Sequence, residues 1–402
     1  MQLAVGFVHN RKSINVELHG TYRDASGATV AAGTYTFDKP TALTPASDDA
    51  SFTVPDVTIG IGFHWERNER QSFRGGLRII QTAGGLTAIN DVELEDYVIS
   101  VISSEMSAFS SIELLKAHAV ISRSWVAYPK LVPQSGLGNA TIRKPGELIR
   151  WYGREAHEHF DICADDHCQR YQGVTKAFSP SVEQAVQATR GEMLTYNGTV
   201  CDARFSKSCG GLTEEYATAW DEQKIPYLVS FYDGSGSAPV MSPEAWIQSS
   251  PSAYCNTTDG RLLKQILPNF DQETTDFYRW TVKYDPDELG EIVKQRLQVD
   301  LGRIVDLQPL ERGPSSRLYR LKIVGSRETL IIGKELEIRR ALSRSHLYSS
   351  AFVVERNGEQ FVLKGAGWGH GVGLCQIGAA VMANQGIGYR EILRHYYPGT
   401  KV

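Results

Sequence analysis

Glu105 is the residue whose position in this sequence most directly indicates proton-transfer chemistry. Leu94, Val98, Val101 and Ile102 follow helical spacing, and Glu105 continues the same apolar stripe at the predicted end of the helix. A carboxyl group on such a stripe loses solvation, and the carbonyl groups at a helix C-terminus add partial negative charge, so both effects raise its pKa. A carboxyl group that keeps its proton at neutral pH can act as a general acid. The alternative is a structural glutamate, and the pattern alone favours that alternative.

The predicted helix offers no second carboxyl group that could share one bond with Glu105. Cleavage of a glycosidic bond usually takes two carboxyl groups, and the other acids of the helix are Glu95 and Asp96. Glu95 is about 15 Å away, at 1.5 Å per residue. A reaction with one carboxyl group therefore fits better. In a lytic transglycosylase the acid protonates the leaving oxygen, and a hydroxyl group of the sugar closes an anhydro ring.

A short segment is dense in metal-binding side chains: His157, His159, Cys163, His167 and Cys168. Two Cys and two His make a closed tetrahedral zinc site, which is structural and not catalytic. We expect Cys163, His167 and Cys168 to bind the metal, with His159 or His157 as the fourth ligand, and we select His159. The alternative is a Cys163–Cys168 disulfide with exposed histidines. The sequence contains no His-Glu-x-x-His, which argues against a zinc protease and leaves a zinc peptidase as a third, weaker hypothesis.

A glycine-rich loop at Gly365–Gly373 carries Trp368 and His370 between a predicted strand (361–363) and a predicted helix (375–384). Its glycines do not follow the G-x-G-x-x-G spacing of a nucleotide-binding loop. Alternating glycines allow a ligand to approach the backbone closely. The Trp368 ring can then stack on a sugar, and His370 can form a hydrogen bond. Packing of Trp368 in the core is the alternative.

The elements that position these residues belong to an α+β fold with a β-rich start. Apolar segments at 77–80 and 86–89 flank a Gly-containing turn and predict a hairpin. A second helix follows the one that carries Glu105, opened by a capping box of Ser110 and Glu113 and ended by Pro129. The prolines and glycines of 129–160 predict a long loop.

The order of these elements predicts a mixed catalytic core interrupted by a smaller inserted α/β domain, which contains a helix near 288–298 and strands at 318–324 and 330–332. The predicted segments are a β-rich N-terminal region (1–90), the first part of the core (91–221), the inserted domain (222–345) and the second part of the core (346–402).

Composition excludes several classes of protein. The 402 residues are 42% hydrophobic and 22% charged with a net charge of −4, which is typical of a folded globular protein. Since no Lys/Arg-rich run is present, nucleic acid is not an expected partner. No apolar run reaches the roughly 18 residues of a membrane span, and the apolar stretch at 3–8 is too short for a signal peptide, so we expect any export signal to be missing from this sequence.

Together the sequence motifs described above resemble the stage II sporulation protein D / amidase-enhancer (SpoIID/LytB) domain family, over roughly residues 90–220 and 350–402. The blocks that carry the resemblance are Leu94-Glu95-Asp96-Tyr97-Val98, Ser104-Glu105-Met106, Leu115 to Val120 with Arg123, Phe205-Ser206 before Gly210-Gly211, and Gly367 to Gly373 with Gln376 and Gly378.

The resemblance implies a lytic transglycosylase that acts outside the cytoplasm, in the periplasm or cell envelope, on peptidoglycan glycan strands stripped of their stem peptides. It implies Glu105 as the catalytic acid and base and a structural zinc ion at Cys163, His167 and Cys168. Other members enhance a cell-wall amidase, which makes an amidase a second expected partner. The residues expected to line the glycan groove are Arg123, Ser206, Gly210, Trp368, His370 and Gln376.

The sequence departs from the family pattern at four positions: Ser107, His118, Cys209 and Cys375. The first replaces a proline, the second a glutamine, and the last a serine. Because the two cysteines fall in motifs expected to meet in space, the resemblance raises a Cys209–Cys375 disulfide as a hypothesis.

Overall fold

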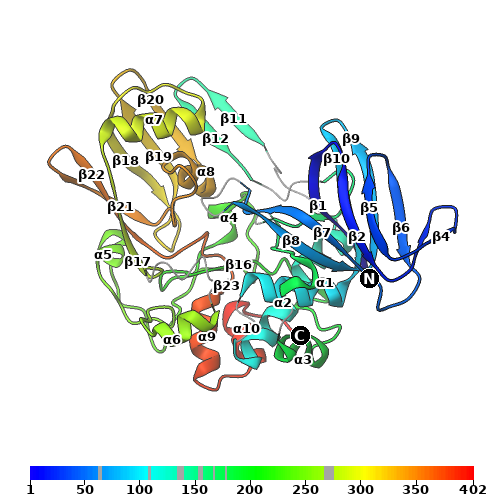
Figure 1. The fold of residues 1–402 in the computed structure, drawn as a ribbon. Coiled ribbons are helices and arrows are strands. Elements are labelled where there is room, and N and C mark those ends of the chain that lie inside the picture. Colours follow the sequence, from blue (N-terminus) through cyan, green and yellow to red (C-terminus); the bar gives the residue numbers. More distant parts are fainter. Residues whose placement is uncertain are drawn as a thin grey trace. The chain divides into compact units, whose positions relative to one another are not determined.

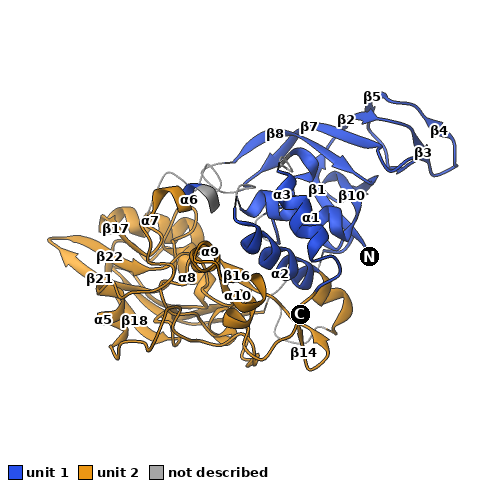
Figure 2. Ribbon diagram, turned by 90° about the horizontal axis from the view of Figure 1, so that it is seen from below, with its two compact units in different colours: residues 1–126, 156–192, 264–271 blue, residues 127–155, 193–263, 272–402 orange. Residues whose placement is uncertain are grey.

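The computed structural model describes residues 1–61, 66–106, 110–133, 140–152, 157–165, 168–176, 179–266 and 276–402. The chain divides into two compact units, coloured separately in Figure 2. Unit 1 comprises 1–126, 156–192 and 264–271, and unit 2 comprises 127–155, 193–263 and 272–402. The predicted region 1–90 lies in unit 1, and the predicted insertion 222–345 lies in unit 2 except for 264–271.

Unit 1 is built on two β-sheets (Figure 1). Within the described residues, one sheet has the strand order β13-β1-β10-β9-β6-β3-β4 and the other β5-β2-β7-β8. The strands are β1 (Gln2–Arg11), β2 (Ile14–His19), β3 (Tyr22–Asp24), β4 (Thr29–Val30), β5 (Gly33–Phe37), β6 (Thr41–Pro45), β7 (Ser51–Ile59), β8 (Arg67–Arg74), β9 (Gly76–Thr82), β10 (Gly85–Glu93) and β13 (Ile162–Cys163).

The two sheets pack through aromatic side chains. The Phe7 ring on β1 lies 4.3 Å from that of Phe73 on β8 and 6.2 Å from that of Phe52 on β7. Strands β9 and β10 form the predicted antiparallel hairpin, with Gly85 opposite Thr82 at the turn. The helices of this part of the chain are α1 (Leu94–Glu105), α2 (Ile112–Leu131), η1 (Gly173–Lys176) and α3 (Pro180–Ala188).

The two predicted helices around Glu105 are present with small differences at their ends. The predicted stripe residues of α1 are buried, and Glu105 is its last residue. Helix α2 is capped by Ser111, whose Oγ accepts the Leu114 N–H at 3.4 Å, so the predicted capping box at Ser110 was wrong by one residue. The helix also continues past Pro129 to Leu131. A proline in the last turn removes only one hydrogen bond, which a helix end tolerates.

Unit 2 contains the remaining sheets. Within the described residues, their strand orders are β11-β12-β20-β19-β18, β17-β22-β21, β14-β15 and β16-β23. The strands are β11 (Thr141–Lys144), β12 (Glu147–Arg150), β14 (Thr195–Tyr196), β15 (Thr199–Val200), β16 (Phe205–Ser206), β17 (Arg279–Tyr284), β18 (Ile304–Arg312), β19 (Leu318–Gly325), β20 (Thr329–Gly333), β21 (Phe352–Asn357), β22 (Gln360–Ala366) and β23 (Leu374–Cys375). The helices are α4 (Tyr216–Ala219), α5 (Pro243–Gln248), α6 (Gly260–Ile266), α7 (Pro286–Leu297), α8 (Glu335–Ala341), α9 (Gln376–Asn384) and α10 (Tyr389–Tyr396).

A core of unit 2 lies where α7 and α8 pack with strands β18 to β22, and it includes Leu289, Ile292, Leu321, Ile323 and Phe361. The mixture of helices with mostly antiparallel sheets in both units confirms the α+β fold class. The predicted loop 129–160 was wrong in part, because β11 and β12 form a hairpin there around Gly146, which has a φ of +75°. Among the described residues, no helix combines the length and hydropathy needed to cross a membrane.

Candidate functional site

Glu105 ends α1 in a half-buried position, and a neighbouring segment fixes its carboxylate. The backbone N–H of Arg170 donates to Oε1 of Glu105 at 2.9 Å. The same segment follows α1 toward its start. Gln172 N–H donates to Ser100 Oγ at 3.1 Å, and the Tyr97 hydroxyl donates to Gln169 Oε1 at 2.9 Å. The carboxylate is therefore held by backbone that is itself anchored along the helix.

A group of metal-binding side chains precedes that segment directly. The ligand atoms of His157, Cys163 and Cys168 all lie within 4.8 Å of one another, and we call these three residues the His/Cys cluster. His157 Nε2 is 3.4 Å from Cys168 Sγ. Two thiolates and an imidazole at such separations fit a tetrahedral zinc ion.

The cluster differs in membership from the predicted set of ligands. His167 lies outside the described residues. His159 is exposed and its Nε2 is 3.8 Å from a carboxylate oxygen of Glu158, so the histidine of the cluster is His157 and the selection of His159 is corrected. Cys163 and Cys168 are not joined by a disulfide, so the alternative of a bridge between them is not what the structure contains.

The His/Cys cluster and Glu105 surround the same buried phenol. Burial raises the pKa of Tyr97 well above its ordinary value, and the nearby charges of Cys168, Glu105 and Cys163 raise it further. Tyr97 therefore stays neutral, as a donor to Gln169. The catalytic candidate and the metal candidate thus belong to one local structure within unit 1.

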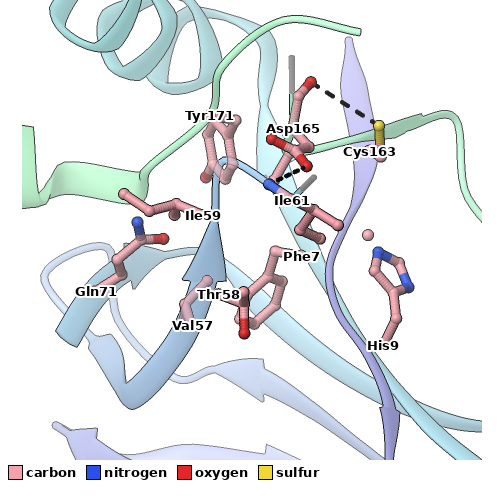
Figure 3. A pocket seen from close by; sticks show the side chains of 12 residues that line it. Phe7, His9, Val57, Thr58, Ile59, Ile61, Gln71, Cys163, Asp165 and Tyr171 are labelled. Atoms are coloured by element: carbon pink, nitrogen blue, oxygen red, sulfur yellow. Dashed lines mark hydrogen bonds between the residues drawn. The ribbon is translucent and has the colours of Figure 1, made fainter. Parts of the chain in front are cut away.

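Sequence reasoning missed His9, which stands beside the His/Cys cluster. Figure 3 shows His9 and Cys163 lining one small pocket together with Phe7, Gln71 and Tyr171. Burial lowers the pKa of His9, with opposing effects from Cys163 and His157. A single histidine on a strand gives no signal in the sequence, because its approach to Cys163 depends on the parallel pairing of β1 with β13.

Arg123 has a different place from the one predicted. Its side chain is fully buried, where the resemblance implied a position in the glycan groove. Its Nη2 and Nε donate to the Glu95 carboxylate at 2.8 and 3.1 Å, and its Nη1 donates to the Glu192 carbonyl at 2.8 Å. This pair joins the start of α1 to α2. It also occupies Glu95, at the opposite end of α1 from Glu105.

The glycine-rich loop in unit 2 encloses a buried arginine of the protein itself. Arg317 is fully buried, and its Nε donates to the Gly369 carbonyl at 3.1 Å. A Cβ on Gly367 would lie 2.8 Å from Arg317 Nη2, and a Cβ on Gly371 would overlap the same guanidinium. Both glycines also have positive φ. The predicted close approach is present, and the group of the chain that approaches these glycines is Arg317.

Trp368 and His370 are half-buried on this loop. The Trp368 ring lies 4.3 Å from that of Tyr348 and 4.8 Å from that of Phe277. His370 Nδ1 accepts the Val372 N–H at 3.0 Å, and the ring meets the edge of Trp220 at 4.7 Å. Burial holds the pKa of His370 well below its usual value, and nearby arginines lower it further. His370 is therefore neutral at pH 7.

The other predicted groove residues of unit 2 are buried. Ser206 lies on β16, and its Oγ has no hydrogen-bond partner among the described residues. Gly210 has a φ of +78°, and a Cβ there would lie 2.8 Å from the Gly367 nitrogen, so it lets the turn contact the glycine-rich loop. Gln376 is the first residue of α9.

The predicted Cys209–Cys375 bridge is wrong, although the two residues do meet. Both are free thiols, and the Cys209 N–H donates to Cys375 Sγ at 3.2 Å. A third cysteine that the sequence did not associate with them, Cys255, has its sulfur 3.6 Å from that of Cys209.

Comparison with known proteins identifies family regions within the chain. Residues 82–196 match the family described as "Stage II sporulation protein". This range includes Glu105 and the His/Cys cluster. Residues 214–373 match a domain described as one of unknown function.

Similarity to individual proteins extends over most of the chain. Stage II sporulation protein D of Bacillus subtilis is 27% identical over 318 residues, which are 78% of this chain and 76% of that protein. The same protein of Bacillus amyloliquefaciens is also 27% identical, over 320 residues, 78% of this chain and 75% of that protein. The Amidase enhancer of Bacillus subtilis is 26% identical over 75% of this chain but only 39% of its own length. Residues 82–196 are thus similar to the Stage II sporulation protein (SpoIID) family.

Proposed function

We propose that this protein is a lytic transglycosylase that cleaves the glycan strands of peptidoglycan with Glu105 as its single acid and base. The observation that supports it most is the half-buried Glu105 carboxylate at the end of α1, oriented by the Arg170 N–H at 2.9 Å. Orientation matters because a proton-transfer group must lie within hydrogen-bond reach of its substrate atom in one defined direction. The names of the relatives, a sporulation protein and an enhancer of an amidase, fit a role in the cell wall.

The reaction needs two proton transfers at one carboxyl group. The transferable proton is the one that the Glu105 carboxyl group carries. The acid gives this proton to the glycosidic oxygen as the bond to the sugar's C1 breaks. The resulting carboxylate then takes the proton of the C6 hydroxyl while that oxygen bonds to C1. The products are one strand with a free hydroxyl group and one with a 1,6-anhydro end, and the carboxyl group is restored.

The absence of a partner acid beside Glu105 on α1 supports this route over hydrolysis. Glu95 is at the other end of the helix, about 15 Å away, and is bound by Arg123. Inverting and retaining glycosidases need a second carboxyl group within about 10 Å. Because α1 carries no such second group near Glu105, closure of the sugar's own ring is favoured over addition of water.

The His/Cys cluster fits a zinc ion with a structural role. With the predicted ligand His167 as its fourth member, this set of thiolates and imidazoles is closed, so it supplies a cross-link and leaves no coordination position for a reactive water. Cys168 is two residues before Arg170, so a metal there would fix the backbone that orients Glu105. For Trp368 and His370, we propose contact with the sugar chain through a ring face and a ring N–H. The reaction's substrate implies action outside the cytoplasm.

The second candidate is a protein that binds peptidoglycan and enhances a cell-wall amidase without cleaving it. Similarity to the Amidase enhancer favours this alternative, although the match covers 39% of that relative. The two candidates differ in their products. Purified protein incubated with glycan strands stripped of stem peptides should release 1,6-anhydro ends, detected by mass spectrometry. Intact strands, together with faster release of stem peptides when an amidase is added to whole peptidoglycan, would support the enhancer.

A further inference from the structure

Four side chains of unit 2 bring their ligand atoms together in the interior, and they do not belong to the site described above. The ligand atoms all lie within 4.8 Å of one another. We call this group the Cys/Asp cluster: Cys209, Asp233, Cys255 and Cys375. All four residues are at most 2% exposed. They come from a turn after β16, two loops and the residue that caps α9. We propose that the Cys/Asp cluster binds one structural zinc ion.

The separations within the cluster match those around a single tetrahedral ion. With zinc–sulfur bonds of about 2.3 Å, two thiolates of a tetrahedral site lie about 3.8 Å apart. The Cys209 and Cys255 sulfurs are 3.6 Å apart, and Cys209 Sγ is 3.2 Å from Asp233 Oδ2. Ligand atoms this close can surround one ion.

Backbone N–H groups point at the sulfurs, as they do at thiolates. Cys375 Sγ accepts N–H donors from Cys209 at 3.2 Å and from Gly378 at 3.4 Å. Cys209 Sγ accepts the Gly211 N–H at 3.4 Å. Cys375 also caps α9, whose N-terminus favours negative charge. These donors stabilise thiolates, the form in which cysteine binds a metal.

The carboxylate is oriented in the manner of a metal ligand. Oδ1 of Asp233 accepts the Tyr396 hydroxyl at 2.9 Å and lies 3.0 Å from His395 Nε2. Its other oxygen, Oδ2, faces the Cys209 sulfur. Hydrogen bonds to the oxygen that does not bind metal are the usual outer support of a ligand. A Cβ at Gly378 would lie 2.6 Å from Oδ2, so only glycine lets α9 come this close.

A metal explains the composition of this interior better than a disulfide does. A Cys209–Cys255 bridge would take from Oδ2 of Asp233 the thiol that it faces, and only Oδ1 would keep its contacts with Tyr396 and His395. A buried carboxylate oxygen that lacks both a hydrogen bond and a metal is costly. Three thiolates with one carboxylate around a single ion indicate zinc among the common divalent metals.

The ion would secure the loops that carry Trp368 and His370. The Cys209 carbonyl accepts Arg317 Nη1 at 3.1 Å, and Ser208 exchanges backbone hydrogen bonds with Trp368 at 3.0 and 2.8 Å. The Cys/Asp cluster thus anchors the turn on which the glycine-rich loop is built. This role does not depend on the proposed enzymatic activity.

The test is the zinc content of the purified full chain, produced in zinc-supplemented medium and passed over a chelating resin. Cys255→Ser and Cys375→Ser should each lower the zinc content by about one ion per chain relative to the native protein. The matched control is Cys201→Ser, since Cys201 is a fully buried cysteine of the same unit outside the cluster. Cys163→Ser removes a ligand of the other cluster, so its effect should add to that of Cys255→Ser.

Two measurements on the native protein keep the test independent of how the variants fold. X-ray absorption at the zinc edge should show sulfur-rich coordination. Intact mass should show every cysteine reduced. An unchanged zinc content in both cluster variants, or a native chain two hydrogens lighter with Cys209 linked to Cys255, would overturn the proposal.

Discussion

The backbone N–H of Arg170 donates to Oε1 of Glu105 at 2.9 Å, only two residues after Cys168 of the His/Cys cluster. The orientation of the proposed catalytic carboxyl group therefore depends on a segment that begins at Cys168, a proposed metal ligand. This arrangement connects a structural ion to activity without giving the ion a chemical step.

Loss of the His/Cys cluster should slow catalysis without abolishing the fold. We expect Cys168→Ser to lower kcat on glycan strands by about 10- to 100-fold, the usual effect of disturbing the support of an active site, with little change in KM. Cys201→Ser should leave kcat unchanged. Product assays and circular dichroism check both. If a chelator abolished cleavage instantly while every structural signal and the position of the carboxyl group were retained, zinc would be catalytic, as in a zinc peptidase, and the structural assignment would be wrong.

The buried Arg123–Glu95 pair should matter for stability. Because Glu95→Gln leaves the fully buried Arg123 charge without its carboxylate, we expect a loss of about 3 kcal/mol in the free energy of unfolding. The control is Asp96→Asn on the same turn, whose exposed partner Arg74 is 3.5 Å away. That change should cost about 1 kcal/mol or less. Urea unfolding measures both, and equal losses would contradict the structural role of the pair.

Glu214 should make stability depend on pH. This carboxyl group accepts hydrogen bonds from Ser315 and Thr218, and burial raises its pKa from 4.5 to about 7. The folded chain then holds a proton that the unfolded chain has released. The contribution of Glu214 to the free energy of unfolding is fully present below pH 4.5. It is lost as the pH rises through about 7, and the loss amounts to about 3 kcal/mol.

Replacing Glu214 with Gln should remove this part of the pH dependence. Melting temperatures of native and variant chains between pH 4 and 8 provide the comparison. The difference between the two curves isolates Glu214 from other titrating groups. Parallel curves would show that Glu214 titrates as in the unfolded chain.

The glycine-rich loop should be intolerant of side chains because of Arg317. Gly371→Ala adds a Cβ that overlaps the guanidinium and strains a positive φ, whereas Gly358→Ala has open space around a φ of +61°. The Gly358 change should cost about 1 kcal/mol, the strain of the left-handed region. The Gly371 change should cost several times more. Similar melting temperatures for the two variants would mean that the loop does not pack on Arg317 as described.

The parts of the structure that depend on local pattern could be predicted from the sequence. Helix α1 and the place of Glu105 at its end follow from apolar spacing over a dozen residues. Fixation by Arg170 could not be predicted, because that contact joins positions 65 residues apart. The sequence could not show which of His157 and His159 joins the cluster, because the two side chains are chemically identical. Only the path of the folded chain brings His157 to Cys168.

The close approach that the glycine-rich loop permits could be predicted from its glycines, but the approaching group could not. Its glycines do permit close approach, but the approaching group, Arg317, lies about fifty residues earlier in the chain. The Cys/Asp cluster could not be predicted for the same reason. Its four residues are far apart in the sequence and come together only in the folded chain.

Comparison of native protein with Glu105→Gln on glycan strands free of stem peptides tests whether Glu105 transfers the proton. The amide keeps the shape of the side chain but cannot exchange the proton. We expect the rate at which 1,6-anhydro ends form to fall by about 10²- to 10⁴-fold in Glu105→Gln. Glu93→Gln, which changes an exposed acid just before α1, should retain the native rate. A Glu105→Gln variant that releases anhydro ends as fast as the native protein would contradict this role.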